Sequence, residues 1–94
     1  MSTLDFSTTI GNAWFPAPTF TASGCASSGR ELAQFFLLRD MGGVVTKSVM
    51  SKLRPGRPTP RMAETPSGML NSIGLQGPGI DAFLAKDIPF LVEQ

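Results

Sequence analysis

The 94-residue chain lacks histidine altogether and has a single cysteine, Cys25. Without histidine, neither a Ser-His-Asp triad nor a Cys-His pair can be assembled within the chain. One cysteine cannot form an internal disulfide, and it leaves too few ligands for a zinc or iron–sulfur site. Because no partner is available to activate its thiol, we interpret Cys25 as a small buried residue. Sparse cysteine is also typical of a reducing cytoplasm.

Long apolar runs are missing as well. No stretch approaches the roughly 18 apolar residues that a membrane span needs, so we expect no membrane partner. Residues 1–10 contain no basic start followed by an apolar run, and we expect no signal peptide. The formal net charge of +1 does not select nucleic acid or a membrane surface as partner. These features predict a soluble, cytoplasmic protein.

The composition that remains suits one small globular unit with many loops. Apolar residues make up 41% of the chain, which is enough for a packed core and too many for a disordered chain. Ten glycines and eight prolines predict frequent turns. Residues 4–15 alternate weakly around a turn signal at Gly11 and Asn12, which indicates a short hairpin. Residues 19–22 then read as a strand.

Residues 28–41 carry the clearest helical pattern. Ser28 and Glu31 have the spacing of a capping box, and the glycines that follow Met41 would end the helix. One face is apolar, formed by Leu32, Phe35 and Phe36. Residues 44–46 form a short β-branched run that indicates a buried strand.

A basic, proline-rich loop is predicted over residues 48–66. Pro55, Pro58 and Pro60 rule out a helix there and make a central strand improbable. Residues 67–76 read as irregular. Pro78 then opens a second helix, which Pro89 limits or kinks.

The order of these elements is strand, helix, strand, long loop and helix, which is typical of parallel strands in an α/β fold. Two parallel strands alone leave both sheet edges exposed. The pattern therefore predicts the opening of a larger fold. A (β/α)8 TIM barrel needs about 250 residues, and this chain would supply roughly its first quarter, preceded by the short hairpin.

Two segments end the predicted strands, residues 22–24 and 46–48, at the side of the sheet where α/β folds bind ligands. A small residue and Gly24 allow backbone to approach a planar ring or a phosphate. Lys47 would bring a positive charge into such a site. The same pattern also describes a strand that simply reaches solvent.

The loop from Lys47 to Arg61 has five basic residues and no acidic one. It is either a solvated surface loop or a lid that attracts an anion. Nucleic-acid binding is a weaker third interpretation, since no aromatic residue interrupts the loop for base stacking. Residues 71–76 pair amides with a glycine. They suit either recognition of a flat amide-rich ring or ordinary turn chemistry.

These segments follow one another in an order that resembles the dihydroorotate dehydrogenases. The resemblance covers about residues 15–91, and its most specific part runs from Arg54 to Gln76. The matching segments are Ala22-Ser23-Gly24-Cys25, Gly29-Arg30-Glu31, Val45-Thr46-Lys47-Ser48, Arg54-Pro55-Gly56-Arg57-Pro58-Thr59-Pro60-Arg61, the run from Glu64 to Gln76, and Pro78-Gly79. They look closest to the soluble branch, whose catalytic subunit works with an iron–sulfur FAD electron-transfer subunit and NAD.

The resemblance implies an FMN-dependent oxidation of dihydroorotate to orotate in pyrimidine synthesis, by an oligomer of identical chains. The implied FMN-binding residues are Ala22, Ser23, Gly24, Lys47 and Ser48. The implied substrate-binding residues are Lys47, the side chain of Asn71, and the backbone at Ile73, Gly74 and Leu75. An ammonium group at Lys47 would stabilise the negative charge that forms on a reduced flavin. Arg61 would order a lid formed by residues 48–66.

Three departures from the family pattern are visible. Ala26-Ser27-Ser28 stands where the family often has aromatic-glycine pairs, and Arg57 stands where asparagine is usual. The family's general base and phosphate-binding glycines lie downstream of the segment that this chain covers, so no catalytic residue is assigned here. We therefore expect this chain alone to be inactive. The alternative is a non-catalytic module that binds or self-associates through exposed strand edges.

Overall fold

The structure is a computed structural model that describes residues 4–94. The chain divides into two compact units, one formed by the described residues up to Ser48 together with 89–94, the other by residues 49–88.

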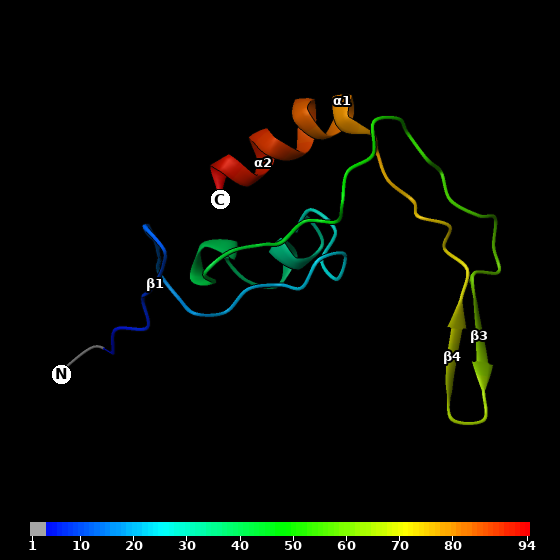
Figure 1. The fold of residues 1–94 in the computed structure, drawn as a ribbon, viewed down its shortest axis with the longest axis horizontal. Helices are drawn as coiled ribbons and strands as arrows, with labels where there is room; N and C mark the ends of the chain where they lie inside the picture. The colour runs from blue at the N-terminus through cyan, green and yellow to red at the C-terminus, as the bar shows by residue number, and fades with distance from the viewer. Residues whose placement is uncertain (1–3) are drawn as a thin grey trace. The chain divides into compact units, whose positions relative to one another are not determined.

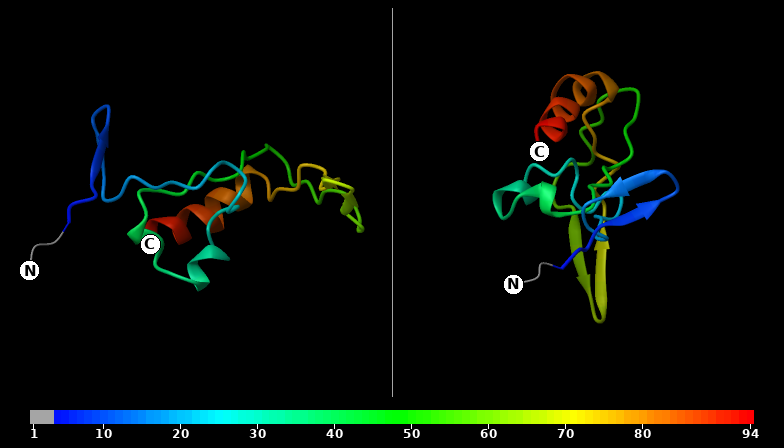
Figure 2. Two further views of the ribbon diagram at one scale, coloured as in Figure 1. Left: turned by 90° about the horizontal axis from the view of Figure 1, so that it is seen from below. Right: turned by 90° about the vertical axis from the view of Figure 1, so that its left-hand side faces the viewer.

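The first unit opens with the predicted hairpin. Strands β1 (Thr8–Ile10) and β2 (Ala13–Phe15) pair antiparallel, with Thr9 opposite Trp14. Gly11 takes the left-handed conformation at a φ of 61°, which the two-residue turn requires and glycine adopts without strain. Figure 2 shows the two strands side by side in its right-hand view. The prediction of a short hairpin within residues 4–15 is confirmed.

The predicted helix over residues 28–41 is wrong. Two single 3-10 turns stand in its place, η1 (Leu32–Gln34) and η2 (Leu38–Asp40). Leu37 between them is extended, and no side-chain capping bond forms at Glu31. The reason lies in packing, because the chain turns back to bury Leu38 against Gly29. A Cβ placed on Gly29 would lie 3.0 Å from Leu38 Cδ1.

The two predicted parallel strands are reduced to one parallel bridge, between Phe20 and Gly43. Their direction was predicted correctly, but regular pairing stops after this bridge because a side chain replaces the backbone. The Thr21 hydroxyl accepts the Val45 N–H at 2.9 Å, and it donates to the Val45 carbonyl at 3.4 Å. The segments therefore run beside each other without forming strands.

The second unit contains a hairpin where loop and irregular structure were predicted. Strands β3 (Met62–Thr65) and β4 (Gly68–Asn71) pair antiparallel with Pro66 and Ser67 as the turn (Figure 1). Proline is absent between Pro60 and Pro66, which leaves four residues free to pair. The rest of the predicted loop has no regular element, and an antiparallel bridge joins Arg54 to Gly77. The lid boundary at residue 66 therefore includes one strand.

The predicted C-terminal helix is confirmed, with a later start and no stop at Pro89. It consists of α1 (Ile80–Ala82), a π-helical turn η3 (Phe83–Asp87) and α2 (Ile88–Glu93). Gly79 is the N-cap, so Pro78 lies just outside the helix. Ile88 N–H bonds to Phe83 O, five residues back. This wider turn lets the helix continue past Pro89, which has no N–H to donate.

Burial is slight throughout the part of the chain that the structure describes. Leu38, with 5% of its surface exposed, is the only buried large apolar side chain among these residues. Nineteen large apolar residues, from Leu4 to Val92, are classed as exposed. None of the described helices is long and apolar enough to span a membrane.

Candidate functional site

The segments at the ends of the two predicted strands lie next to each other. Ser23 Oγ donates to the Thr46 carbonyl at 3.3 Å. Gly24 has a φ of 80°, and nothing lies within 4 Å of the position that a Cβ would occupy there. Gly24 therefore presents bare backbone to open space, beside the segment that carries Lys47. This juxtaposition was expected from the parallel course of the two segments.

The backbone of Lys47 is anchored to the loop that contains Ser27. Its N–H donates to the Ser27 carbonyl at 3.3 Å, and the side chain is partly buried. Ser27 has a φ of 50°, a left-handed conformation that costs a serine strain. Ser48 follows Lys47 at the exposed surface. The sequence did not predict that the Ser27 carbonyl anchors Lys47. Its one signal was that Ala26-Ser27-Ser28 stands where the family often has aromatic-glycine pairs.

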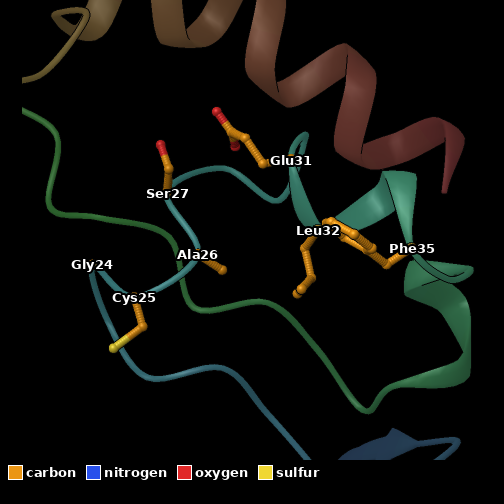
Figure 3. Close-up of a pocket in the computed structure, with 7 residues that line it drawn as sticks. All are labelled: Gly24, Cys25, Ala26, Ser27, Glu31, Leu32 and Phe35. Atoms are coloured by element: carbon orange, nitrogen blue, oxygen red, sulfur yellow. The ribbon is translucent and has the colours of Figure 1, made fainter.

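A pocket of about 330 Å³ lies beside Gly24 (Figure 3). Leu32 and Phe35 lie on the side of the pocket opposite Gly24 and Cys25 in this view. The interpretation of Cys25 as a buried residue is wrong, because the thiol is exposed. Its N–H donates to Ala22 O at 3.1 Å in a surface turn, and this turn keeps the side chain out of any core. The pocket is lined by Gly24, Cys25, Ala26, Ser27, Glu31, Leu32 and Phe35.

In the second unit, the carbonyls of Ile73 and Gly74 accept hydrogen bonds, whereas the amides of residues 73–75 are free. Ile73 O accepts the Arg57 N–H at 2.9 Å, and Gly74 O accepts Arg54 Nε at 2.7 Å. Gly74 and Leu75 both have positive φ, 82° and 56°. Within the described chain, the N–H groups of residues 73–75 meet no acceptor. Successive free amides in such a turn form a concave anion-binding nest.

Arg61 organises the basic loop. Its Nε donates to Arg57 O at 2.7 Å, one terminal nitrogen donates to Pro55 O at 3.1 Å, and the other donates to Gln76 Oε1. The guanidinium thus joins three points of the second unit, as the expected role of Arg61 in ordering the loop requires. The sequence did not predict that the Gln76 side chain accepts a hydrogen bond from Arg61, because an amide in a turn segment does not indicate its partner.

Asn71 ends β4 opposite Met62, and its side chain is exposed. It shares the second unit with residues 73–75, whereas Lys47 and residues 22–24 belong to the first unit. The predicted site is thus formed as two separate halves. The first unit holds the open backbone of Gly24 and Lys47, and the second holds Asn71 and the nest.

The first half fits one face of a flavin. A planar ring needs backbone without a projecting side chain, and Gly24 supplies it. The Ser23 hydroxyl adds a polar group beside this surface, and its hydrogen bond to Thr46 O holds the segment that carries Lys47 alongside. No group of three or more His, Cys, Asp or Glu residues is gathered for a metal ion in the described part of the chain.

Comparison with known proteins identifies the family of the chain. The family model for dihydroorotate dehydrogenase matches residues 5–94. The chain is 55% identical over 74 residues to the catalytic subunit of dihydroorotate dehydrogenase B (NAD(+)) from Pelobacter propionicus, which covers 79% of this chain and 24% of that protein. It is 46% identical over 91 residues to the subunit of the same name from Alkaliphilus metalliredigens, which covers 97% of this chain and 30% of that protein.

A third relative of this name, from Trichlorobacter lovleyi, is 51% identical over 82 residues, covering 87% of this chain and 27% of that protein. The chain thus spans about a quarter to a third of the length of these curated relatives. The family model nevertheless covers nearly all of its residues. This chain belongs to the dihydroorotate dehydrogenase family.

Proposed function

We propose that this chain forms the opening part of a catalytic (β/α)8 barrel that oxidises dihydroorotate to orotate with FMN, in cytoplasmic pyrimidine synthesis. The observation that carries the proposal is the junction of residues 22–24 with 46–48 through the Ser23–Thr46 hydrogen bond, which sets the bare backbone of Gly24 beside the lysine segment. The family match and the names of the relatives supply the reaction class.

The residues divide between cofactor and substrate. Ala22, Ser23 and Gly24 would lie along the FMN ring, and Ser48 would support it. Bound FMN supplies the acceptor for the substrate hydride. The Lys47 ammonium would hold the negative charge that develops at the pyrimidine end of the ring, an electrostatic contribution that grows as water is excluded.

In the second unit, substrate recognition falls to Asn71 and its neighbours. The Asn71 amide would pair with the donor and acceptor edge of the substrate ring. The free amides of residues 73–75 would bind the substrate carboxylate. Residues 48–66 would close over the site as a lid, with Arg61 fixing the lid's conformation.

We assign no general base among these residues, so the chain alone is expected to be inactive. An iron–sulfur FAD subunit that passes electrons to NAD is the proposed partner, since the relatives are named NAD(+)-dependent catalytic subunits. We also propose that the complete chain forms an oligomer of identical subunits.

A fused enzyme tests this proposal. It would join residues 1–94 of this chain to the part of the Alkaliphilus metalliredigens relative that follows the matched segment. The purified fused enzyme should be yellow and should produce orotate from dihydroorotate. Lys47→Ala should lower kcat about a hundredfold, the scale of losing one preorganised charge contact.

Arg39→Ala is the matched control for Lys47→Ala, because Arg39 is an exposed cation outside the candidate site. Its kcat should stay within about twofold of the parent. A fused enzyme that folds but stays colourless, or that binds FMN and oxidises no dihydroorotate, would overturn the proposed function.

Self-association is a second candidate function, and the exposed edges of the β3–β4 hairpin favour it. All eight residues of the two strands are exposed, and unpaired strand edges invite further strands. This function predicts a discrete multimer of the isolated chain without flavin. The mass of the chain in solution separates it from the first proposal.

A further inference from the structure

We propose that Arg57 binds the substrate carboxylate and makes this site selective for carboxylated rings over uncharged ones. The inference rests on the proposed function, since it concerns the substrate of the same site. It starts from the unequal use of the three arginines in the loop, Arg54, Arg57 and Arg61.

Two of these arginines are committed to the protein's own backbone. Arg54 Nε donates to Gly74 O at 2.7 Å. Arg61 donates to two carbonyls and to the Gln76 amide. In contrast, within the described residues the Arg57 guanidinium forms no hydrogen bond or ion pair, although Arg57 belongs to the same ordered loop. A guanidinium with no acceptor of its own in the protein is available to an anionic ligand.

Backbone and side-chain contacts of Arg57 fix the position of the base of its side chain. Its N–H donates to Ile73 O at 2.9 Å. The first part of its side chain lies against Gly74, because a Cβ on Gly74 would come within 2.9 Å of Arg57 Cγ. Arg57 is exposed, so solvent and ligands can reach the guanidinium. The side chain that carries the charge therefore begins directly beside the nest formed by residues 73–75.

A nest and a guanidinium together match a carboxylate better than either group alone. The free amides of residues 73–75 offer donors on one side. The planar guanidinium fork offers a bidentate pair of donors, the geometry that carboxylates prefer. Dihydroorotate and orotate each carry one ring carboxylate, whereas uracil is a ring of the same kind without it. Arg57 should therefore strengthen orotate binding and leave uracil binding unchanged.

The test measures orotate and uracil affinity in the fused enzyme, read from the change in flavin absorbance when each ligand binds. Arg57→Ala should weaken orotate binding about tenfold or more, the scale of one charge-assisted contact. Uracil affinity should change less than twofold. Arg57→Lys should fall between, since it keeps the charge and loses the fork. Arg39→Ala removes an exposed arginine elsewhere and should leave both affinities unchanged.

Each outcome decides between the two proposals. A yellow, active parent whose orotate and uracil affinities respond equally to Arg57→Ala, or do not respond, overturns the role of Arg57 and leaves the proposed function standing. A folded parent without flavin or activity overturns the proposed function, and the role of Arg57 falls with it. A selective loss of orotate affinity supports both.

Discussion

Ser27 carries backbone strain at the point that anchors Lys47. Its φ of 50° places a serine in the left-handed region, and its carbonyl accepts the Lys47 N–H. Left-handed backbone costs a non-glycine residue roughly 1–2 kcal/mol. Glycine lowers this cost but adds freedom to the unfolded chain. Ser27→Gly should therefore raise the free energy of unfolding of the fused enzyme by up to about 1 kcal/mol.

Ser28→Gly is the matched control, because Ser28 has no positive φ. It should lower the free energy of unfolding by about 0.5–1 kcal/mol, through unfolded-state entropy alone. Urea denaturation of both variants measures the difference. Equal effects of the two substitutions would show that the strain at Ser27 contributes nothing.

Gly74 is the residue that lets Arg57 pack closely beside the nest. Alanine there meets two obstacles, a φ of 82° and a Cβ within 2.9 Å of both Arg57 N and Arg57 Cγ. Strain and overpacking should together lower the free energy of unfolding by about 2–4 kcal/mol. Gly77→Ala meets no atom within 4 Å and should stay within about 0.5 kcal/mol. Thermal unfolding of the two variants in the fused enzyme is the measurement. Similar shifts in Tm would contradict the packing described for Gly74.

At this scale the sequence predicted which segments lie side by side better than it predicted the burial and hydrogen-bond partners of single residues. The adjacency of residues 22–24 to Thr46 followed from the expected parallel course. The exposure of Cys25 did not, because the turn that its N–H closes with Ala22 O sets it, and no local sequence pattern indicates burial or exposure there. The family resemblance implied the ordering role of Arg61. The different uses of Arg54 and Arg57 could not be predicted, since two arginines in one loop look alike until their acceptors are placed.

At the scale of elements, local sequence signals predicted the structure correctly where it depends on hydrogen bonds between residues close together in the chain. Gly11 and Asn12 fixed the first hairpin, and proline placement excluded helix from the basic loop. The helix predicted over residues 28–41 failed because its apolar face has nothing to pack on. Tertiary packing, more than propensity, stabilises amphipathic helices, and Leu38 is the only large apolar side chain of this segment that is buried. The β3–β4 hairpin was not predicted because Pro66, which lies in its turn, is as typical of an irregular loop as of a hairpin turn.

The basic loop is held as an element by Arg61. Replacing Arg61 with alanine removes donors to Pro55 O, Arg57 O and the Gln76 side chain. We expect hydrogen exchange in the fused enzyme to quicken about tenfold or more at two amides, Arg57 and Ser72. Arg57 N–H bonds to Ile73 O, and Ser72 N–H bonds to Arg61 O. Arg61→Lys keeps the charge with one donor group and should give an intermediate rate. Unchanged exchange at both amides would show that the loop is ordered by other contacts.

At the scale of the whole molecule, apolar exposure is the dominant fact. Nineteen large apolar side chains of the described residues are exposed, against one that is buried. Hydrophobic burial is the main term that opposes chain entropy, at about 25 cal/mol per Å² of apolar surface. With so little apolar surface buried, hydrophobic stabilisation of the isolated chain does not offset the conformational entropy that folding removes. These side chains need a covering surface, either from the rest of a barrel or from further copies of the chain.

The isolated chain should therefore unfold without a cooperative transition, whereas the fused enzyme should show one. Circular dichroism during urea denaturation, at two protein concentrations, distinguishes the sources of the covering surface. A gradual change at both concentrations fits a barrel whose remaining strands supply the core. A sharp transition that moves to higher urea as concentration rises would instead show that copies of the chain cover one another. A sharp transition independent of concentration would contradict the argument from exposure, because the single chain would then bury enough surface by itself.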